Sequence, residues 1–129
     1  MDLKEKHEKL LYPVVRIFAE TGAGSGTVVY SKEDPNNNGE FQTFVLTNHH
    51  VIKDLIVLKD AWHSVLKKTV KTEFMSKAKV EIFSYHNDSI MDSSNRYGAD
   101  IVAYSDSHDL AVLKLDSPTP VKYVAPILP

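Results

Sequence analysis

The sequence predicts an all-β domain, a barrel or a sandwich, and two observations carry this prediction. Six or seven short segments rich in Val, Ile, Thr, Tyr and Phe are separated by turn-forming residues, and little of the chain has helical spacing. The length of 129 residues allows one domain with one core, and a hydrophobic content of 43% with 25% charged residues is that of an ordinary globular domain.

A short helical segment is expected at the N-terminus, over residues 1–12. Asp2 can cap its first turn, its leucines lie roughly on one side, and Pro13 ends it. A helix this short needs a surface to lie on, because an isolated helix of its length is marginal in water. The β domain then occupies residues 13–129.

The expected strands share β-branched, aromatic or alternating apolar residues. We expect them at 14–18, 27–30, 41–47, 79–85, 99–104 and 110–115. Residues 31–39 and 87–95 are rich in polar and turn-forming residues and are expected to be loops. Residues 61–70 fit either a helix or a hairpin arm, and the nearby threonines favour the arm.

Charge is segregated along the chain although the net charge is only −2. Residues 53–79 carry seven lysines and three acids, whereas residues 81–109 carry six acids and one arginine. The net charge gives no global basic field, so no nucleic-acid partner is expected. Adjacent blocks of opposite sign are expected to pair across strands, and a basic surface for an acidic partner is the alternative.

The basic block is expected to form a projecting β-hairpin or an irregular arm. Its lysines cannot be buried, so at least one of its faces is in contact with water. Trp62, Leu66 and Phe74 are too apolar for a fully solvated loop, so part of the arm is expected to dock on the barrel.

Several classes of protein are excluded by what the sequence lacks. It has no cysteine, which excludes a disulfide framework, a thiolate zinc site and a cysteine nucleophile within these residues. It has no apolar run of about 18 residues, so no membrane partner is expected. The N-terminus does not resemble a secretion signal, and together with the lack of cysteine this favours a cytoplasmic location.

Three short motifs carry candidate chemistry. Gly24-Ser25-Gly26 precedes a strand and by itself indicates a tight turn or a close approach of backbones. His50 follows an apolar strand, which would hold a catalytic base on rigid backbone, although a lone histidine is more often a surface or core residue. Asp109 directly precedes an apolar strand, where it either caps a turn or pairs with a histidine.

The adjacent histidines also raise the possibility of a metal site. Neighbouring residues point apart on a strand or a helix, so His49 and His50 would rarely share one ion. We therefore expect no metal and no cofactor, and a metal-dependent hydrolase that uses His49, His50 and Asp109 is kept as an alternative.

Taken in order, these motifs resemble the trypsin-like serine endopeptidases of the chymotrypsin fold, most closely their HtrA-like, cysteine-free branch. The matching segments are Gly24-Ser25-Gly26, the TNHHV run at 47–51 and the DLAVLKL run at 109–115, and the resemblance covers roughly residues 14–128. It implies a six-stranded antiparallel Greek-key barrel of the trypsin type, the N-terminal half of that family's fold. It also implies a polypeptide substrate, with His50 as general base and Asp109 as the orienting acid of a Ser-His-Asp triad.

The sequence departs from the family at two points. The GxSGG-type segment that holds the nucleophilic serine does not occur here, so this chain alone is expected to be inactive. A C-terminal barrel carrying that serine would come from the same parent chain or from a second chain. The separation of His50 from Asp109 is long for the family and indicates a basic insertion at about 53–79. The alternative to an enzyme half is a non-enzymatic, protease-like binding module.

Overall fold

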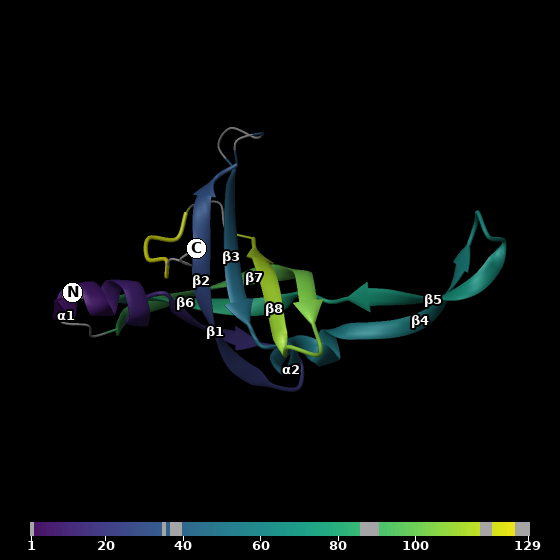
Figure 1. Ribbon diagram of the computed structural model, residues 1–129, viewed down its shortest axis with the longest axis horizontal. Coiled ribbons are helices and arrows are strands. Elements are labelled where there is room, and N and C mark those ends of the chain that lie inside the picture. The colour runs from purple at the N-terminus through teal and green to yellow at the C-terminus, as the bar shows by residue number, and fades with distance from the viewer. Residues whose placement is uncertain (1, 35, 37–39, 86–90, 117–119, 126–129) are drawn as a thin grey trace.

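The computed structural model describes residues 2–34, 36, 40–85, 91–116 and 120–125 (Figure 1). The helical elements are α1 (Leu3–Lys6) with a π-helical continuation (His7–Leu11), and α2 (His49–Ile52) with a 3-10 continuation (Lys53–Leu55). The strands are β1 (Val14–Phe18), β2 (Ala23–Glu33), β3 (Phe41–Thr47), β4 (Ile56–His63), β5 (Lys68–Met75), β6 (Ala78–Tyr85), β7 (Met91–Ser105) and β8 (Leu110–Leu115). No helix among the described residues is long and apolar enough to cross a membrane.

Six of the strands close into a barrel in the order β1-β2-β3-β8-β7-β6, and each neighbouring pair is antiparallel. The chain passes from β3 to β6 without pairing them, and β7 and β8 fill the space between (Figure 1). The predicted six-stranded antiparallel Greek-key barrel is therefore confirmed. The predicted N-terminal helix is also present, and the Asp2 carboxylate accepts a hydrogen bond from the backbone N–H of Glu5 at 2.8 Å.

The core follows from strand alternation, because every second side chain points into the barrel. Ile17, Val45 and Leu113 are fully buried in this way.

The glycine motif lies within β2 rather than in a turn. A Cβ at Gly26 would lie 2.6 Å from Ile17 Cδ1 and 2.8 Å from Val45 Cγ1, and a Cβ at Gly24 would lie 2.5 Å from Val51 Cγ2. The motif was expected to mark either a tight turn or a close approach of neighbouring chain segments, and the structure shows the close approach.

Two strands are longer than the sequence pattern predicts. The strand expected at 27–30 runs from Ala23 to Glu33, and the strand expected at 99–104 runs from Met91 to Ser105. The expected loop at 87–95 is therefore wrong from residue 91 onward, and residues 86–90 lie outside the described residues. The physical reason is pairing: β6 supplies a full backbone hydrogen-bond partner to the polar start of β7, with Ile82 opposite Asn95.

β4 and β5 form a separate two-stranded hairpin that projects from the barrel, on the side away from α1 and the segment 120–125 (Figure 1). Its root is held by the Tyr104 hydroxyl, which donates to the Glu73 carboxylate, and by the Ser76 N–H, which donates to the Leu55 carbonyl at 2.9 Å. The expected docking of this arm through Trp62, Leu66 and Phe74 is wrong: their exposed fractions are 67%, 55% and 46%. In a two-stranded hairpin the facing backbone groups pair with each other and water hydrates the outer edges, so the hairpin can extend without resting on the barrel.

The two charged blocks pair with each other less than expected. Among the described residues, Lys77 joins Asp100 at 3.3 Å and also contacts the Asp116 carboxylate. The other described ion pairs that involve a lysine or an arginine lie within a block, as between Lys71 and Asp60 at 3.4 Å. The hairpin's projection explains this, because it carries most of the basic block away from the acidic strands.

Candidate active site

α2 places His50 on the rim of the barrel at the end of β3. Asn48 has extended backbone angles (φ −95°, ψ 146°) and its carbonyl accepts the Val51 N–H at 3.2 Å, so the chain turns directly from strand into one helical turn. The preceding strand end is fixed by the Thr47 hydroxyl, which donates to the Ser25 carbonyl at 2.8 Å. A short turn on a rigid strand thus positions the imidazole.

Asp109 comes from the tight turn that joins β7 to β8. Its backbone has a positive φ of 52°, a left-handed conformation that Asp and Asn tolerate better than most residues. Its N–H donates to the Asp106 carbonyl at 3.2 Å, and its own carbonyl accepts a hydrogen bond from Asn48 Nδ2 at 2.9 Å. The turn is therefore tied directly to the start of α2.

The two candidate residues meet through both oxygens of the carboxylate. Asp109 Oδ2 lies 2.7 Å from His50 Nδ1, and Asp109 Oδ1 accepts the backbone N–H of His50 at 2.8 Å. The predicted hydrogen-bonded pair is thereby confirmed. Both side chains are solvent-accessible, with 65% of His50 and 46% of Asp109 exposed. No hydrogen bond within the described part of the chain involves His50 Nε2, so this nitrogen is available to a reacting group.

The same contact lowers the pKa of the Asp109 carboxyl from its ordinary value of 3.8. The main cause is the hydrogen bond from the His50 backbone N–H, followed by the one to the His50 ring. Desolvation acts in the opposite direction and is outweighed, while the charges of His50 and His49 lower the pKa further. Asp109 therefore stays ionised well into the acidic range.

Acid stability is expected to depend on Asp109. A carboxyl whose pKa is lowered by folding stabilises the folded state above the unfolded value, here about 3.8, and this contribution is lost as pH falls through the lowered value. We expect the Asp109 carboxyl carbon to titrate in NMR with a midpoint below 3.8. In His50→Ala the backbone donor remains, so the midpoint should rise but stay lowered. A wild-type midpoint at or above 3.8 would contradict the conclusion that the contact with His50 lowers the pKa of Asp109.

His49 faces a different set of partners. Its ring stacks on Tyr104 with the centroids 5.2 Å apart, and its Nδ1 lies 3.5 Å from Asp106 Oδ1. The two adjacent histidines thus engage separate carboxylates, as expected for neighbours on one turn. In the part of the chain that the structure describes, no group of three or more His, Asp or Glu side chains is arranged to hold a metal ion.

The serines near the site contact another histidine. Ser105 Oγ and Ser107 Oγ lie 2.9 Å and 3.2 Å from His108 Nδ1, on the exposed β7–β8 turn. Ser25 contributes its carbonyl to Thr47. None of the hydrogen bonds between described residues joins a serine hydroxyl to His50.

Sequence reasoning assigned no role to Asn48, although it belongs to the quoted TNHHV motif. Its side-chain amide holds the carbonyl of Asp109, the residue with a left-handed backbone. The sequence offers no signal for this contact, because the partner of Asn48 is a backbone carbonyl on the distant β7–β8 turn.

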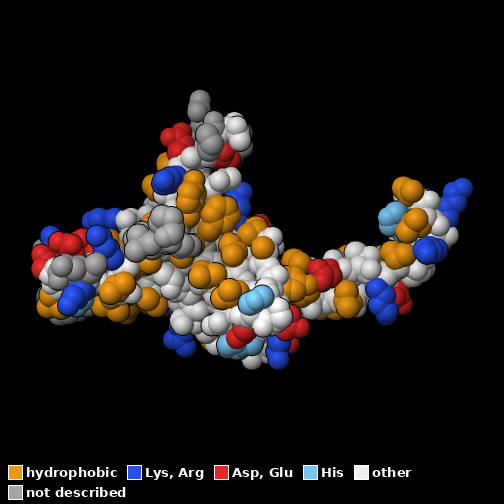
Figure 2. Space-filling model, viewed as in Figure 1, with side chains coloured by type: hydrophobic (Ala, Val, Ile, Leu, Met, Phe, Trp, Pro, Cys, Tyr) orange, Lys and Arg blue, Asp and Glu red, His pale blue; other side chains and the backbone are white. Residues whose placement is uncertain are grey.

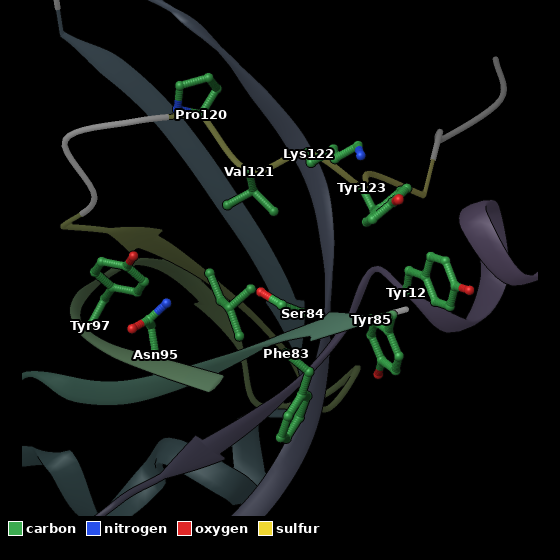
Figure 3. Close-up of a pocket in the computed structure, with 11 residues that line it drawn as sticks. Tyr12, Phe83, Ser84, Tyr85, Asn95, Tyr97, Pro120, Val121, Lys122 and Tyr123 are labelled. Carbon is green, nitrogen blue, oxygen red and sulfur yellow. The ribbon is translucent and has the colours of Figure 1, made fainter. Parts of the chain in front are cut away.

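A hollow of about 320 Å³ lies elsewhere, between the ends of β6 and β7, the segment 120–123 and Tyr12 (Figure 3). Tyr12 stacks on Tyr85 at 4.3 Å and meets Tyr123 edge-on at 4.8 Å. Neither His50 nor Asp109 lines it. These aromatic contacts hold the N-terminal helix and the segment 120–125 against the barrel.

The closed six-stranded barrel and its strand order define a protein of the trypsin-like fold class. The model of the trypsin-like peptidase domain family matches residues 24–127, and the chain belongs to this family. No curated protein matches the sequence.

Two solved structures show the same fold. The MamO protease domain from Magnetospirillum magneticum, in its apo form, aligns with a TM-score of 0.52 and 17% identity, covering 89% of this chain and 44% of that one. The crystal structure of Deg5 aligns with a TM-score of 0.53 and 21% identity, covering 99% of this chain and 50% of that one. This chain therefore spans half or less of the length of these two structures.

Proposed function

We propose that this chain is the N-terminal barrel of a serine endopeptidase, in which His50 is the general base and Asp109 orients it. The observation that carries the proposal is the two-point contact of the Asp109 carboxylate with the ring and the backbone N–H of His50. Such a contact holds the imidazole in one orientation and in the tautomer that carries its proton on Nδ1. The lone pair on Nε2 is then directed away from Asp109.

In this proposal the substrate is a polypeptide and a second barrel supplies the nucleophilic serine. His50 Nε2 takes the proton of the serine hydroxyl as it attacks the scissile carbonyl, and later gives that proton to the leaving amine. The Asp109 carboxylate stabilises the imidazolium that forms between these steps. The lengths covered in MamO and Deg5 support the need for a second barrel.

The proposed division of the chain follows from this function. Residues 1–12 are an N-terminal helical segment, residues 13–129 are the first barrel, and residues at about 53–79 are an insertion beside the catalytic histidine. His50 and Asp109 are exposed in the single barrel. A second barrel that covers them would exclude water and strengthen their interaction.

A fluorogenic-peptide assay on two forms of the protein tests the proposal. The 129-residue chain alone is expected to show no turnover, because it offers His50 neither a nucleophile nor an oxyanion hole. The same barrel combined with a serine-bearing second barrel, from the same parent chain or from a second chain, is expected to cleave peptides and to react once with a fluorophosphonate probe. Failure of that form to cleave or react would favour a non-enzymatic binding module. Turnover by the isolated barrel would indicate a nucleophile among its own serines.

A further inference from the structure

The end of the β4–β5 hairpin exposes a group of large apolar side chains. We call residues 61–70 the hairpin tip. Within it, Trp62, Val65 and Leu66 have exposed fractions of 67%, 82% and 55%. Figure 2 shows apolar side chains at the far end of the arm, distant from the barrel, beside lysine or arginine side chains. An apolar cluster that the fold itself leaves in water is typical of a contact surface.

The hairpin tip is also cationic. It contains Lys67 and Lys68 and no acidic residue. Both acids of the hairpin are engaged: Asp60, which directly precedes the tip, pairs with Lys71 at 3.4 Å, and Glu73, nearer the root, accepts the Tyr104 hydroxyl. Among the ion pairs within the described residues, none involves Lys67 or Lys68. The free positive charge is therefore adjacent to the apolar cluster.

The turn of the hairpin tip is closed by hydrogen bonds. β4 and β5 pair from Ile56 opposite Met75 to His63 opposite Lys68, and the Lys67 N–H closes the turn on the His63 carbonyl at 2.7 Å. The outward-facing backbone groups of the two strands can stay hydrated where the tip lies at the headgroup boundary, because that boundary contains water. Trp prefers the boundary between apolar and aqueous phases, and lysine can keep its ammonium group at that boundary while its stem is buried.

We propose that the hairpin tip docks on an anionic lipid surface. Trp62, Val65 and Leu66 enter the boundary between headgroups and acyl chains, and Lys67 and Lys68 contact the negative headgroups. This goes beyond the proposed peptidase function and revises the expectation of no membrane partner. That expectation rested on the lack of a spanning segment, which surface docking does not require.

The charge pattern favours the hairpin tip over the other exposed apolar segment. The N-terminal helix also exposes leucines, with 68% of Leu3 and 64% of Leu10 accessible to water. However, residues 2–11 carry three lysines and three acids, so that helix has no net attraction to a negative surface. It provides a matched control for apolar exposure without net positive charge.

Fluorescence of Trp62, the single tryptophan, reports on the hairpin tip directly. With vesicles of phosphatidylcholine mixed with phosphatidylserine, we expect a blue shift of the emission and co-sedimentation of the protein. Vesicles of phosphatidylcholine alone should give a much weaker response. Leu66→Ser should weaken binding by about tenfold, because the lost apolar side chain no longer leaves water. Lys67→Asn and Lys68→Gln should each weaken it by about fivefold, and Asn retains the left-handed turn conformation at position 67.

The control variant Leu10→Ser should bind the mixed vesicles as the wild-type protein does. The proposal is overturned if the emission of Trp62 does not shift on the mixed vesicles, if both kinds of vesicle bind equally, or if Leu10→Ser loses as much binding as Leu66→Ser. A blue shift that appears with rising protein concentration in the absence of vesicles would also overturn it, because a second copy of the chain would then cover the hairpin tip.

Discussion

Replacing His50 with alanine in the two-barrel protein is expected to lower kcat/KM by roughly 10⁴-fold or more, which is the scale of losing the general base of a serine-protease triad. In the proposed mechanism the His50 imidazole is the group that takes the proton of the serine, so its removal leaves that step without a base. The loss should appear mainly in kcat, since His50 acts on the reacting atoms rather than on the rest of the substrate.

The neighbouring His49→Ala variant is the matched control for this experiment. His49 contacts Tyr104 and Asp106 instead of Asp109, so its variant should keep activity within about tenfold of wild type. His50 is 65% exposed, and its removal should leave thermal stability near the wild-type value. If His50→Ala retains most of the activity while His49→Ala loses it, the assignment of the base is wrong.

The change Asp109→Asn is expected to lower kcat by about 10⁴-fold near neutral pH while leaving the fold intact. Asparagine tolerates the left-handed backbone at this position, and its amide oxygen can still accept the His50 N–H. Its amide nitrogen would donate a hydrogen bond to His50 Nδ1, which moves the ring proton to Nε2. The imidazole would then present a donor where a base is required.

Asp106→Asn provides the control for this second experiment. Asp106 lies on the same turn, is 88% exposed and contacts only the neighbouring His49 ring among the described ion pairs. We expect this variant to keep nearly full activity. The tautomer can be read directly from the imidazole nitrogen shifts in NMR, in the single barrel as well as in the two-barrel protein. An Asp109→Asn variant with wild-type activity would show that orientation by this carboxylate is not needed.

The strand pattern and the three motifs were readable from sequence because they depend on local composition. The apolar runs at 14–18, 41–47 and 110–115 are strands with alternate side chains buried, since alternation and β-branching act at short range. The length of β7 was not readable in this way. Its polar beginning is held by hydrogen bonds to β6, and backbone pairing does not depend on apolar side chains.

The pairing of His50 with Asp109 was predicted from a family resemblance, and only the folded structure shows the geometry of their contact. These residues are 59 positions apart, and the barrel brings the end of β3 beside the start of β8. The contribution of Asn48 was missed because its partner is the carbonyl of Asp109, a group that every residue possesses. No pattern of side chains could indicate that contact.

The β4–β5 hairpin shows most clearly what the sequence determines and what only the tertiary structure decides. By itself, the sequence determined that residues 53–79 are basic, that they contain apolar side chains and that strands are favoured there. Only the tertiary structure decided that the arm projects and leaves Trp62, Val65 and Leu66 exposed. The physical reason is that the facing backbone groups of a two-stranded ribbon pair with each other, while water hydrates its outer edges. Local pattern therefore specifies that the hairpin forms, whereas its direction depends on how the root packs against β7.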